Sequence, residues 1–304
     1  MGLRSTGACL LGLLMSDISY AQLGQNMFIG NAKALALGNA VTADPPGIDA
    51  IHYNPAGLAD IVERTQHLKF VLGNADIRAD FIADKNYLQN TDGRGVPDPT
   101  ANTSSEIDNF AVYLPGSGLT ELPVIAAPLG GFSFHLPTSD LTLATAVYAP
   151  MMLGFTRSED DPGAFYGREL GLSRITYLSP SFGLKLSESV SVGAGIGLFY
   201  TGVGMKLDYR AANVLLGAME VARLEYCDHR LAELLTENLC ENLSLSPFEK
   251  LFTLQVDLEE TFSPTFNAGL LWQVTPWLSW GVVYQSEARD NLEGDVAINI
   301  ESIN

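Results

Sequence analysis

The side chains that could carry out acid–base, nucleophilic or metal chemistry are few and stand far apart. The four histidines are His52, His67, His135 and His229, and none has the spacing of a metal-binding pair. No Gly-x-Ser-x-Gly motif accompanies them, so the strand-to-helix nucleophile of many lipid hydrolases is missing. His67 and His135 fall on the polar faces of alternating stretches, which favours a lining role. We therefore expect no enzyme, no cofactor and no metal site.

The first 21 residues have the order of a secretory signal peptide. Arg4 precedes an uncharged run from Ala8 to Met15, and Ser19 and Ala21 supply small residues before the expected cleavage point. The apolar run is much shorter than the roughly 20 residues that a spanning helix requires. The sequence thus predicts a signal peptide over 1–21 and an exported mature chain.

Two cysteines remain in the mature chain, Cys227 and Cys240. Disulfides form and persist in oxidising compartments, so this pair is a disulfide candidate rather than a redox or metal site. Closing so short a loop would stabilise the fold by about 3 kcal/mol in the chain-entropy account.

The charge balance narrows the class of partner. The chain carries 35 acidic and 17 basic residues, a formal net charge of −18. Nucleic-acid binding needs a basic surface that neutralises phosphates, so we expect no nucleic-acid partner.

The elements that must position these side chains are strands with an apolar and a small or polar face. Alternation of period two recurs in 67–73, 132–136, 178–186, 190–198, 266–274, 278–285 and 296–301. The connections between them differ in length: tight turns near 137–140, 187–189 and 275–277 alternate with long charged segments over roughly 85–121, 152–173 and 211–252. This sorting is typical of an outer-membrane β-barrel with short periplasmic turns and long outer loops, and a soluble secreted β-sandwich is the structural alternative.

Two segments do not alternate. Residues 22–64 are rich in Ala, Gly and Asn and end in Asn54-Pro55-Ala56-Gly57, which fits a type I turn. A small-residue segment ahead of a barrel could fill it as a plug. Residues 211–252 carry Leu, Val and Met at helical spacing, which predicts loop helices, either packed on each other or forming an outer groove for an apolar ligand.

Taken together, these stretches resemble the FadL/TodX-type outer-membrane transporters of long-chain fatty acids and hydrophobic hydrocarbons. The resemblance rests on Tyr53-Asn54-Pro55-Ala56-Gly57-Leu58, on the strand from Ala146 to Phe155, on 178–196 and on 284–295. It implies a fourteen-stranded transmembrane antiparallel β-barrel, all-β in class, with an N-terminal hatch in 22–64 and a partial barrel in 65–304. The expected location is the outer membrane of a Gram-negative bacterium.

The resemblance also implies a mechanism and site residues. Hydrophobic molecules would bind in outer loops, pass a rearranging hatch, and leave sideways into outer-membrane lipid beside a kinked strand. Carried over by position, Asn54, Pro55 and Ala56 are the hatch motif, and Ala149 and Pro150 end the strand with the kink. A general porin or surface receptor without hydrophobic selectivity is the alternative function.

The sequence departs from the family in its number of strands. We expect about eight strands, and the chain stops at Asn304 inside an alternating stretch. An open sheet edge in lipid would leave backbone groups unpaired. We expect an N-terminal fragment of a longer protein that is a monomeric barrel when complete; closure of one barrel by several chains is the alternative.

Overall fold

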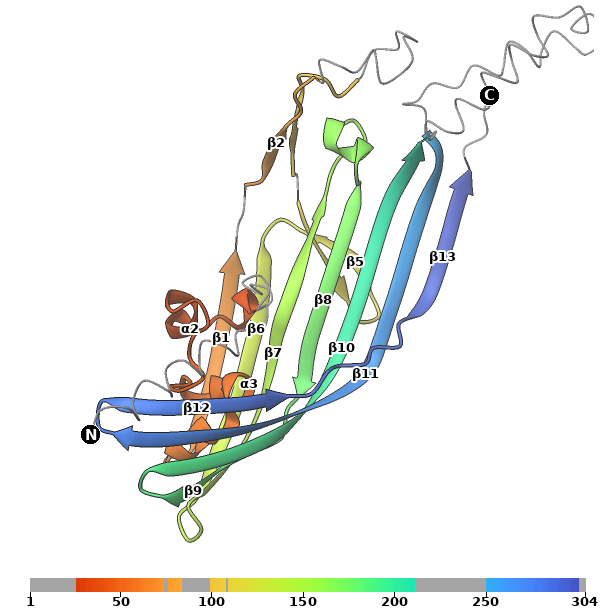
Figure 1. The fold of residues 1–304 in the computed structure, drawn as a ribbon. Coiled ribbons are helices and arrows are strands. Elements are labelled where there is room, and N and C mark those ends of the chain that lie inside the picture. The colour runs from red at the N-terminus through yellow and green to blue at the C-terminus, as the bar shows by residue number, and fades with distance from the viewer. Residues whose placement is uncertain (1–25, 74–75, 84–98, 108, 211–249, 301–304) are drawn as a thin grey trace, which may run out of the picture.

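The computed structural model describes residues 26–73, 76–83, 99–107, 109–210 and 250–300. Its dominant element is one antiparallel sheet with nine strands among these residues (Figure 1). The strands are β1 (Thr65–Gly73), β6 (Ile125–Leu136), β7 (Leu141–Thr156), β8 (Glu169–Leu178), β9 (Ser181–Ser187), β10 (Val190–Arg210), β11 (Lys250–Thr275), β12 (Leu278–Gln285) and β13 (Glu293–Ile300). The predicted all-β class is confirmed.

The nine strands occupy seven positions across the sheet, which we call lanes. β8 and β9 run in line between β7 and β10, each pairing with part of both neighbours. β12 and β13 likewise run in line along β11. Two of the seven lanes are therefore interrupted.

The connections are sorted by length, as predicted. The tight turns β6–β7, β9–β10 and β11–β12 lie at one end of the sheet and the longer connections at the other (Figure 1). The connection predicted over 152–173 is shorter than expected, since β7 continues to Thr156 and β8 begins at Glu169. The predicted loop 211–252 lies outside the described residues except for 250–252, which open β11. No helix among the described residues is long and apolar enough to cross a membrane.

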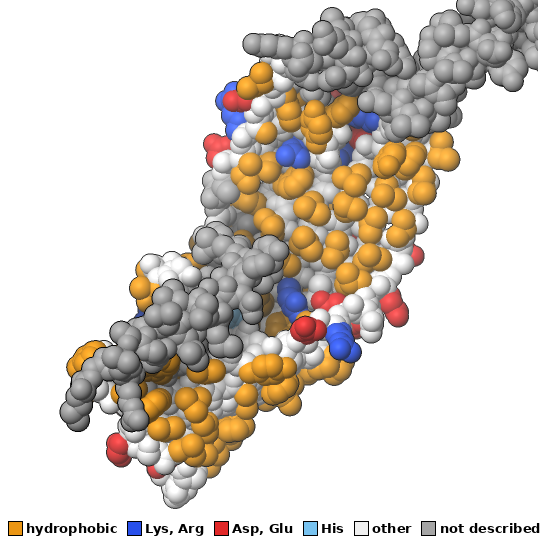
Figure 2. Space-filling view, in the orientation of Figure 1, with side chains coloured by type: hydrophobic (Ala, Val, Ile, Leu, Met, Phe, Trp, Pro, Cys, Tyr) orange, Lys and Arg blue, Asp and Glu red, His pale blue; other side chains and the backbone are white. Residues whose placement is uncertain are grey.

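The apolar face of the sheet is exposed, the reverse of a soluble sandwich. On β1 the outward side chains Leu68, Phe70 and Leu72 are 71%, 68% and 75% exposed. The pattern continues on later strands through Phe132, Phe134, Leu153, Ile196, Trp272, Trp280, Val282, Val296 and Ile298. Figure 2 shows apolar side chains spread over the visible face of these strands. A β-sandwich would bury this face in a core, so exposure on such a scale fits a sheet whose solvent is lipid.

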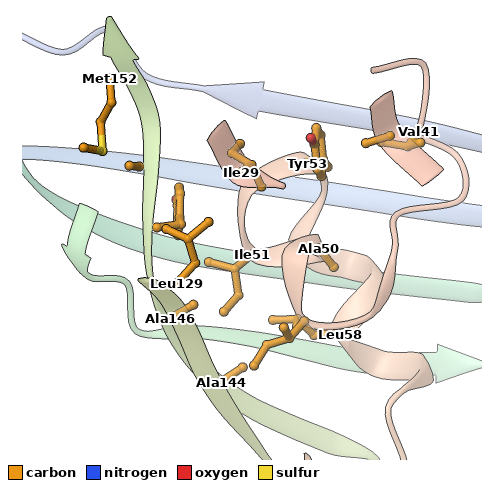
Figure 3. Close-up of a cluster of buried hydrophobic side chains, with 14 of the residues drawn as sticks. Ile29, Val41, Ala50, Ile51, Tyr53, Leu58, Leu129, Ala144, Ala146 and Met152 are labelled. Atoms are coloured by element: carbon orange, nitrogen blue, oxygen red, sulfur yellow. The ribbon is translucent and has the colours of Figure 1, made fainter. Parts of the chain in front are cut away.

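The opposite face of the sheet is covered by the N-terminal segment, a name used here for residues 26–61. It contains η2 (Met27–Ile29), α2 (Ala32–Ala36), η3 (Gly47–Asp49), α3 (Ala50–Tyr53) and η4 (Pro55–Asp60). Asn31 caps α2, with the Ala34 N–H donating to its Oδ1 at 3.1 Å. Figure 3 shows Ile29, Ile51 and Leu58 of this segment near Leu129, Ala144 and Ala146 of the sheet, in the main buried cluster.

A β-hairpin packs on the same face of the sheet, nearer the end with the longer connections. The hairpin of β4 (Phe110–Leu114) and β5 (Gly118–Leu122) lies against β7, β8 and β10. Tyr113 donates its N–H to the buried Ser173 hydroxyl at 3.0 Å. A short ladder of β2 (Arg78–Asp80) and β3 (Ser104–Glu106) and the turn η5 (Pro162–Phe165) complete this end. The long connection predicted over 85–121 thus contains strands of its own, because Phe110–Leu114 is a continuous apolar run.

Candidate functional site

The Asn54-Pro55-Ala56-Gly57 turn lies in the interior, where it joins the N-terminal segment to the sheet. The Gly57 N–H donates to the Asn54 carbonyl at 3.0 Å, the hydrogen bond of the expected turn, and the chain continues as η4. Asn54 is fully buried, and both the oxygen and the nitrogen of its side-chain amide form hydrogen bonds. Its Oδ1 accepts from the Ala56 N–H at 3.1 Å, and its Nδ2 donates to the carbonyls of Thr42 at 2.9 Å and Leu270 at 3.3 Å. The side chain therefore connects the turn to β11.

A row of three glycines receives this turn. Gly183, Gly193 and Gly269 are direct neighbours across β9, β10 and β11. A Cβ on Gly193 would overlap with the Pro55 carbonyl, one on Gly269 with the Asn54 side chain, and one on Gly183 with Leu58 and Ala59. The missing side chains allow the turn to lie directly on the backbone of the sheet.

An ion pair holds the other side of the N-terminal segment. The Lys69 ammonium of β1 lies 2.7 Å from both carboxylate oxygens of Asp49, and it donates to the Ile29 carbonyl at 2.9 Å. Asn31 donates to the same carboxylate at 2.7 Å. Both charged side chains are mostly buried. Removing one partner of a mostly buried ion pair leaves the other charge unpaired, which is costly, so the pair fixes the segment against β1.

A cavity of about 230 Å³ lies between the N-terminal segment and the sheet. Its lining combines apolar and polar side chains, among them Ile51, His52, Tyr148, Pro150, Met151, Arg174, Ser179, Phe199 and Asn267. The cavity also reaches Ile196 and Phe266, which are half exposed on the apolar face. The cavity therefore extends to side chains that belong to both faces of the sheet.

Ala149 and Pro150, the predicted kink residues, lie beside this cavity but do not end their strand. β7 runs through them to Thr156, and the register with β8 shifts between Tyr148 and Met151. The neighbouring lane is interrupted close by, at Ser179 and Pro180 between β8 and β9. A proline has no N–H for the ladder, so each irregularity contains a missing donor.

Arg174 is a functional candidate that the sequence did not reveal. Its guanidinium lies 4.7 Å from the centre of the Phe199 ring in the cavity wall. Within the part of the chain that the structure describes, no ion pair or hydrogen bond joins it to another residue. An arginine beside a cavity without a carboxylate partner can receive an anionic group of a ligand.

The described histidines, His52, His67 and His135, lie on three different elements, α3, β1 and β6. Among the described residues no three His, Cys, Asp or Glu side chains form a group that could hold a metal ion. His135 contacts the Thr142 hydroxyl at 3.0 Å and His67 is exposed on β1. His229, the disulfide candidates Cys227 and Cys240, and the signal peptide 1–21 lie outside the described residues. The disulfide stays a prediction.

His52 makes a pH-dependent contribution to the packing of the N-terminal segment. Its Nε2 lies 3.1 Å from Asn26 Oδ1 and its ring packs edge-on against Tyr53 and Tyr148. Burial lowers the pKa of His52 to about 4 from its usual 6.5, although the nearby Asp49 carboxylate acts in the opposite direction. We call the N-terminal segment docked when it packs on the sheet as here, and undocked when it is released and His52 is exposed to water. Between pH 6.5 and pH 4 the undocked segment binds more protons than the docked one, so docking weakens as the pH falls through this range.

We therefore expect acidification from pH 6.5 towards pH 4 to increase amide exchange in residues 26–61, by at most about tenfold per pH unit for one proton. Hydrogen–deuterium exchange at several pH values, corrected for intrinsic rates, measures this. His52→Phe should flatten the dependence, whereas His67→Gln on exposed β1 should keep it. A dependence unchanged by His52→Phe would contradict the assignment.

The exposed apolar face, the covered glycine face and the loop sorting define an outer-membrane β-sheet protein with an internally packed N-terminal segment. A family model described as outer membrane protein transport protein (OMPP1/FadL/TodX) matches residues 20–302, and the chain belongs to this family. The family is one of transport proteins, not of enzymes. A comparison with curated proteins found no match.

Three solved structures show the same fold. The chain is similar to a FadL homologue of Pseudomonas aeruginosa with a TM-score of 0.51 and 17% identity, over 92% of this chain and 54% of that one. For the CymD monoaromatic hydrocarbon channel the TM-score is 0.52 and the identity 14%, over 89% of this chain and 56% of that one. For the toluene transporter TbuX of Ralstonia pickettii the TM-score is 0.52 and the identity 17%, over 88% of this chain and 60% of that one. The chain thus spans between half and three fifths of the length of these proteins.

Proposed function

We propose that the complete protein is a passive outer-membrane channel for hydrophobic molecules that carry an acidic headgroup, such as long-chain fatty acids. The observation that carries this proposal is Arg174 in the cavity wall without a carboxylate partner among the described residues. Two of the relatives are named for monoaromatic hydrocarbon and toluene, which have no charge for a guanidinium to bind. The Arg174 environment favours an acid over such a neutral ligand.

The N-terminal segment acts as the hatch in this proposal. It packs on the glycine face through the Asn54 turn and is held at β1 by Lys69 and Asp49, so it blocks the route along the inner face. Ligand captured in the outer loops enters the cavity, the hatch rearranges, and the ligand leaves sideways into lipid. A lateral exit avoids transfer of an apolar chain into water, which would be unfavourable. The capture step is assigned to residues 211–252, of which the structure describes only 250–252.

The cavity is small for such a ligand. Small-molecule pockets commonly measure about 300–1,000 Å³, against about 230 Å³ here. The docked state therefore holds the headgroup and the first part of an acyl chain, with the remainder outside the cavity. Hatch rearrangement would have to enlarge the path before the rest of the ligand could follow.

Replacing Arg174 tests the ligand class. In the complete gene product, Arg174→Gln should weaken binding of palmitic acid by about 10- to 100-fold, the worth of one hydrogen bond to a charged group. Binding of the methyl ester should change less than twofold, because the ester has no charge. Isothermal titration in detergent measures both ligands.

Arg168→Gln is the matched control, since Arg168 pairs with Glu159 rather than facing the cavity. Equal losses for acid and ester would show that Arg174 is only structural. Uptake of a neutral hydrocarbon but not of the acid would contradict the proposed ligand. A wide, steady ion conductance in planar bilayers would favour a general porin instead.

A further inference from the structure

The wall of the sheet has a gap in its pairing between β7 and the lane of β8 and β9. Ala144 pairs with Ser181 of β9, and the next assigned pair is Tyr148 with Thr176 of β8. Between these pairs three residues of β7 face four residues of the other lane. The unequal count makes this a bulge, where ladder hydrogen bonds are disrupted.

A side chain closes this gap. The Ser179 hydroxyl, 1% exposed, accepts from the Ala146 N–H at 3.0 Å and donates to the Ala146 carbonyl at 2.7 Å. The Ser179 N–H donates to the Thr145 hydroxyl at 3.3 Å. One serine hydroxyl therefore supplies both bonds that a strand residue would make through its backbone. A rotation about its Cα–Cβ bond breaks both without moving the main chain.

The opposite side of the same lane is intact. Ser181 pairs with Gly195 and Leu178 with Leu198 of β10. Between them the Ile196 N–H donates to the Pro180 carbonyl at 3.0 Å. The interruption is thus bonded through backbone to β10 and mainly through side chains to β7. If the wall opens here, it opens on the β7 side.

Two cavities lie on the two faces of this gap. On the inner face, Tyr148 and Ser179 line the 230 Å³ cavity that contains Arg174. On the apolar face, a groove of about 760 Å³ is lined by Leu68, Phe132, Val147, Tyr177 and Leu178. Val147 and Leu178 are the chain neighbours of Tyr148 and Ser179, so one thickness of strand separates the two spaces.

We propose that Ser179 is the latch of a lateral opening between β7 and the β8–β9 junction, and that the groove beside Phe132 and Tyr177 receives the apolar chain of the departing ligand. This inference rests on the proposed function and adds to it the residue that closes the exit. Ser179 is a positioning residue, since it acts by holding Ala146 rather than by binding the ligand. The ligand is a long-chain acid whose headgroup stays near Arg174 while its tail enters the groove.

The test uses the complete gene product in lipid vesicles, with a fluorescent long-chain fatty acid to measure transfer into vesicle lipid. Ser179→Ala removes both bonds to Ala146 and should accelerate transfer about three- to thirtyfold. Ser179→Thr keeps the hydroxyl and should remain within twofold of wild type. Ser181→Ala is the matched control: its buried hydroxyl lies two residues away and donates to the Ser179 carbonyl, with no bond to β7. Heat-modifiable gel mobility verifies folding of each variant.

A fatty acid with a terminal diazirine locates the path by photo-crosslinking and peptide mapping. We expect label both at Met151 or Phe199 and at Phe132 or Tyr177, with more label at the groove pair in Ser179→Ala. Label inside but not at the groove pair, with Ser179→Ala transferring at the rate of Ser181→Ala, would overturn the latch and leave the proposed function standing. Neither transfer nor internal label in wild type would overturn the proposed function and the latch with it.

Discussion

Gly193→Ala should release the N-terminal segment from the sheet while leaving the strands intact. The added Cβ would overlap with the carbonyl of Pro55 and crowd the N–H of Ala56. These are backbone atoms, which cannot rotate away as a side chain can, so the turn must rise off β10. Overpacking of this kind costs about 1–3 kcal/mol, a change of about 5- to 150-fold in the ratio of docked to undocked segment.

Hydrogen–deuterium exchange of peptides within 26–61 measures this ratio directly, and planar-bilayer conductance measures its consequence. Both should rise in Gly193→Ala. Gly167→Ala is the control, because the nearest atom to its added Cβ is a Leu207 methyl at 3.7 Å, an ordinary contact. Exchange in Gly193→Ala equal to that in Gly167→Ala would show that the turn does not rest on the glycine row as described.

Asn54→Asp should have an equal or larger effect with almost no change in shape. The new carboxylate could still accept from the Ala56 N–H. Its other oxygen, however, would face the carbonyls of Thr42 and Leu270, which the Asn54 amide now satisfies. A charge in a fully buried site with two acceptors against it costs roughly 3 kcal/mol or more. We expect at least about a hundredfold shift towards the undocked segment.

The same exchange experiment checks this, with Asn102→Asp as the control on the exposed turn between β2 and β3. Asn54→Ala should fall between wild type and Asn54→Asp, since it loses the three hydrogen bonds without adding a charge. A ranking in which Asn54→Ala is worse than Asn54→Asp would mean that packing, not hydrogen bonding, holds the turn.

Local patterns predicted the features that depend on neighbours in sequence. Alternation over 278–285 gave both the strand and its apolar face, because the two faces of a strand repeat every second residue. Asn54, Pro55 and Gly57 predicted the turn, because Pro fixes its own backbone and Asn caps the next residues. The start of the sheet near residue 65 was predicted because the small-residue composition ends there.

Features that depend on register could not be predicted in the same way. Gly183, Gly193 and Gly269 form a row only because three strands align at those residues, and nothing near any one of them indicates the other two. Arg174 pairs with Met151 directly beside a register shift, so alternation does not tell which face it occupies. Ser179 bonds to a residue 33 positions away across the gap in the ladder. Each became visible only with the pairing of the strands.

The seven lanes have a consequence for symmetry and assembly. Neighbouring lanes run in opposite directions, so the first lane, β1, and the last, β12 with β13, point the same way. An antiparallel barrel needs an even number of lanes, and a barrel built on this sheet therefore takes an odd number more. Two copies related by a twofold axis along the barrel would bring like-directed strands together at both seams, giving parallel pairs where every other neighbour is antiparallel. Strand polarity alone thus disfavours closure of one barrel by a pair of identical chains.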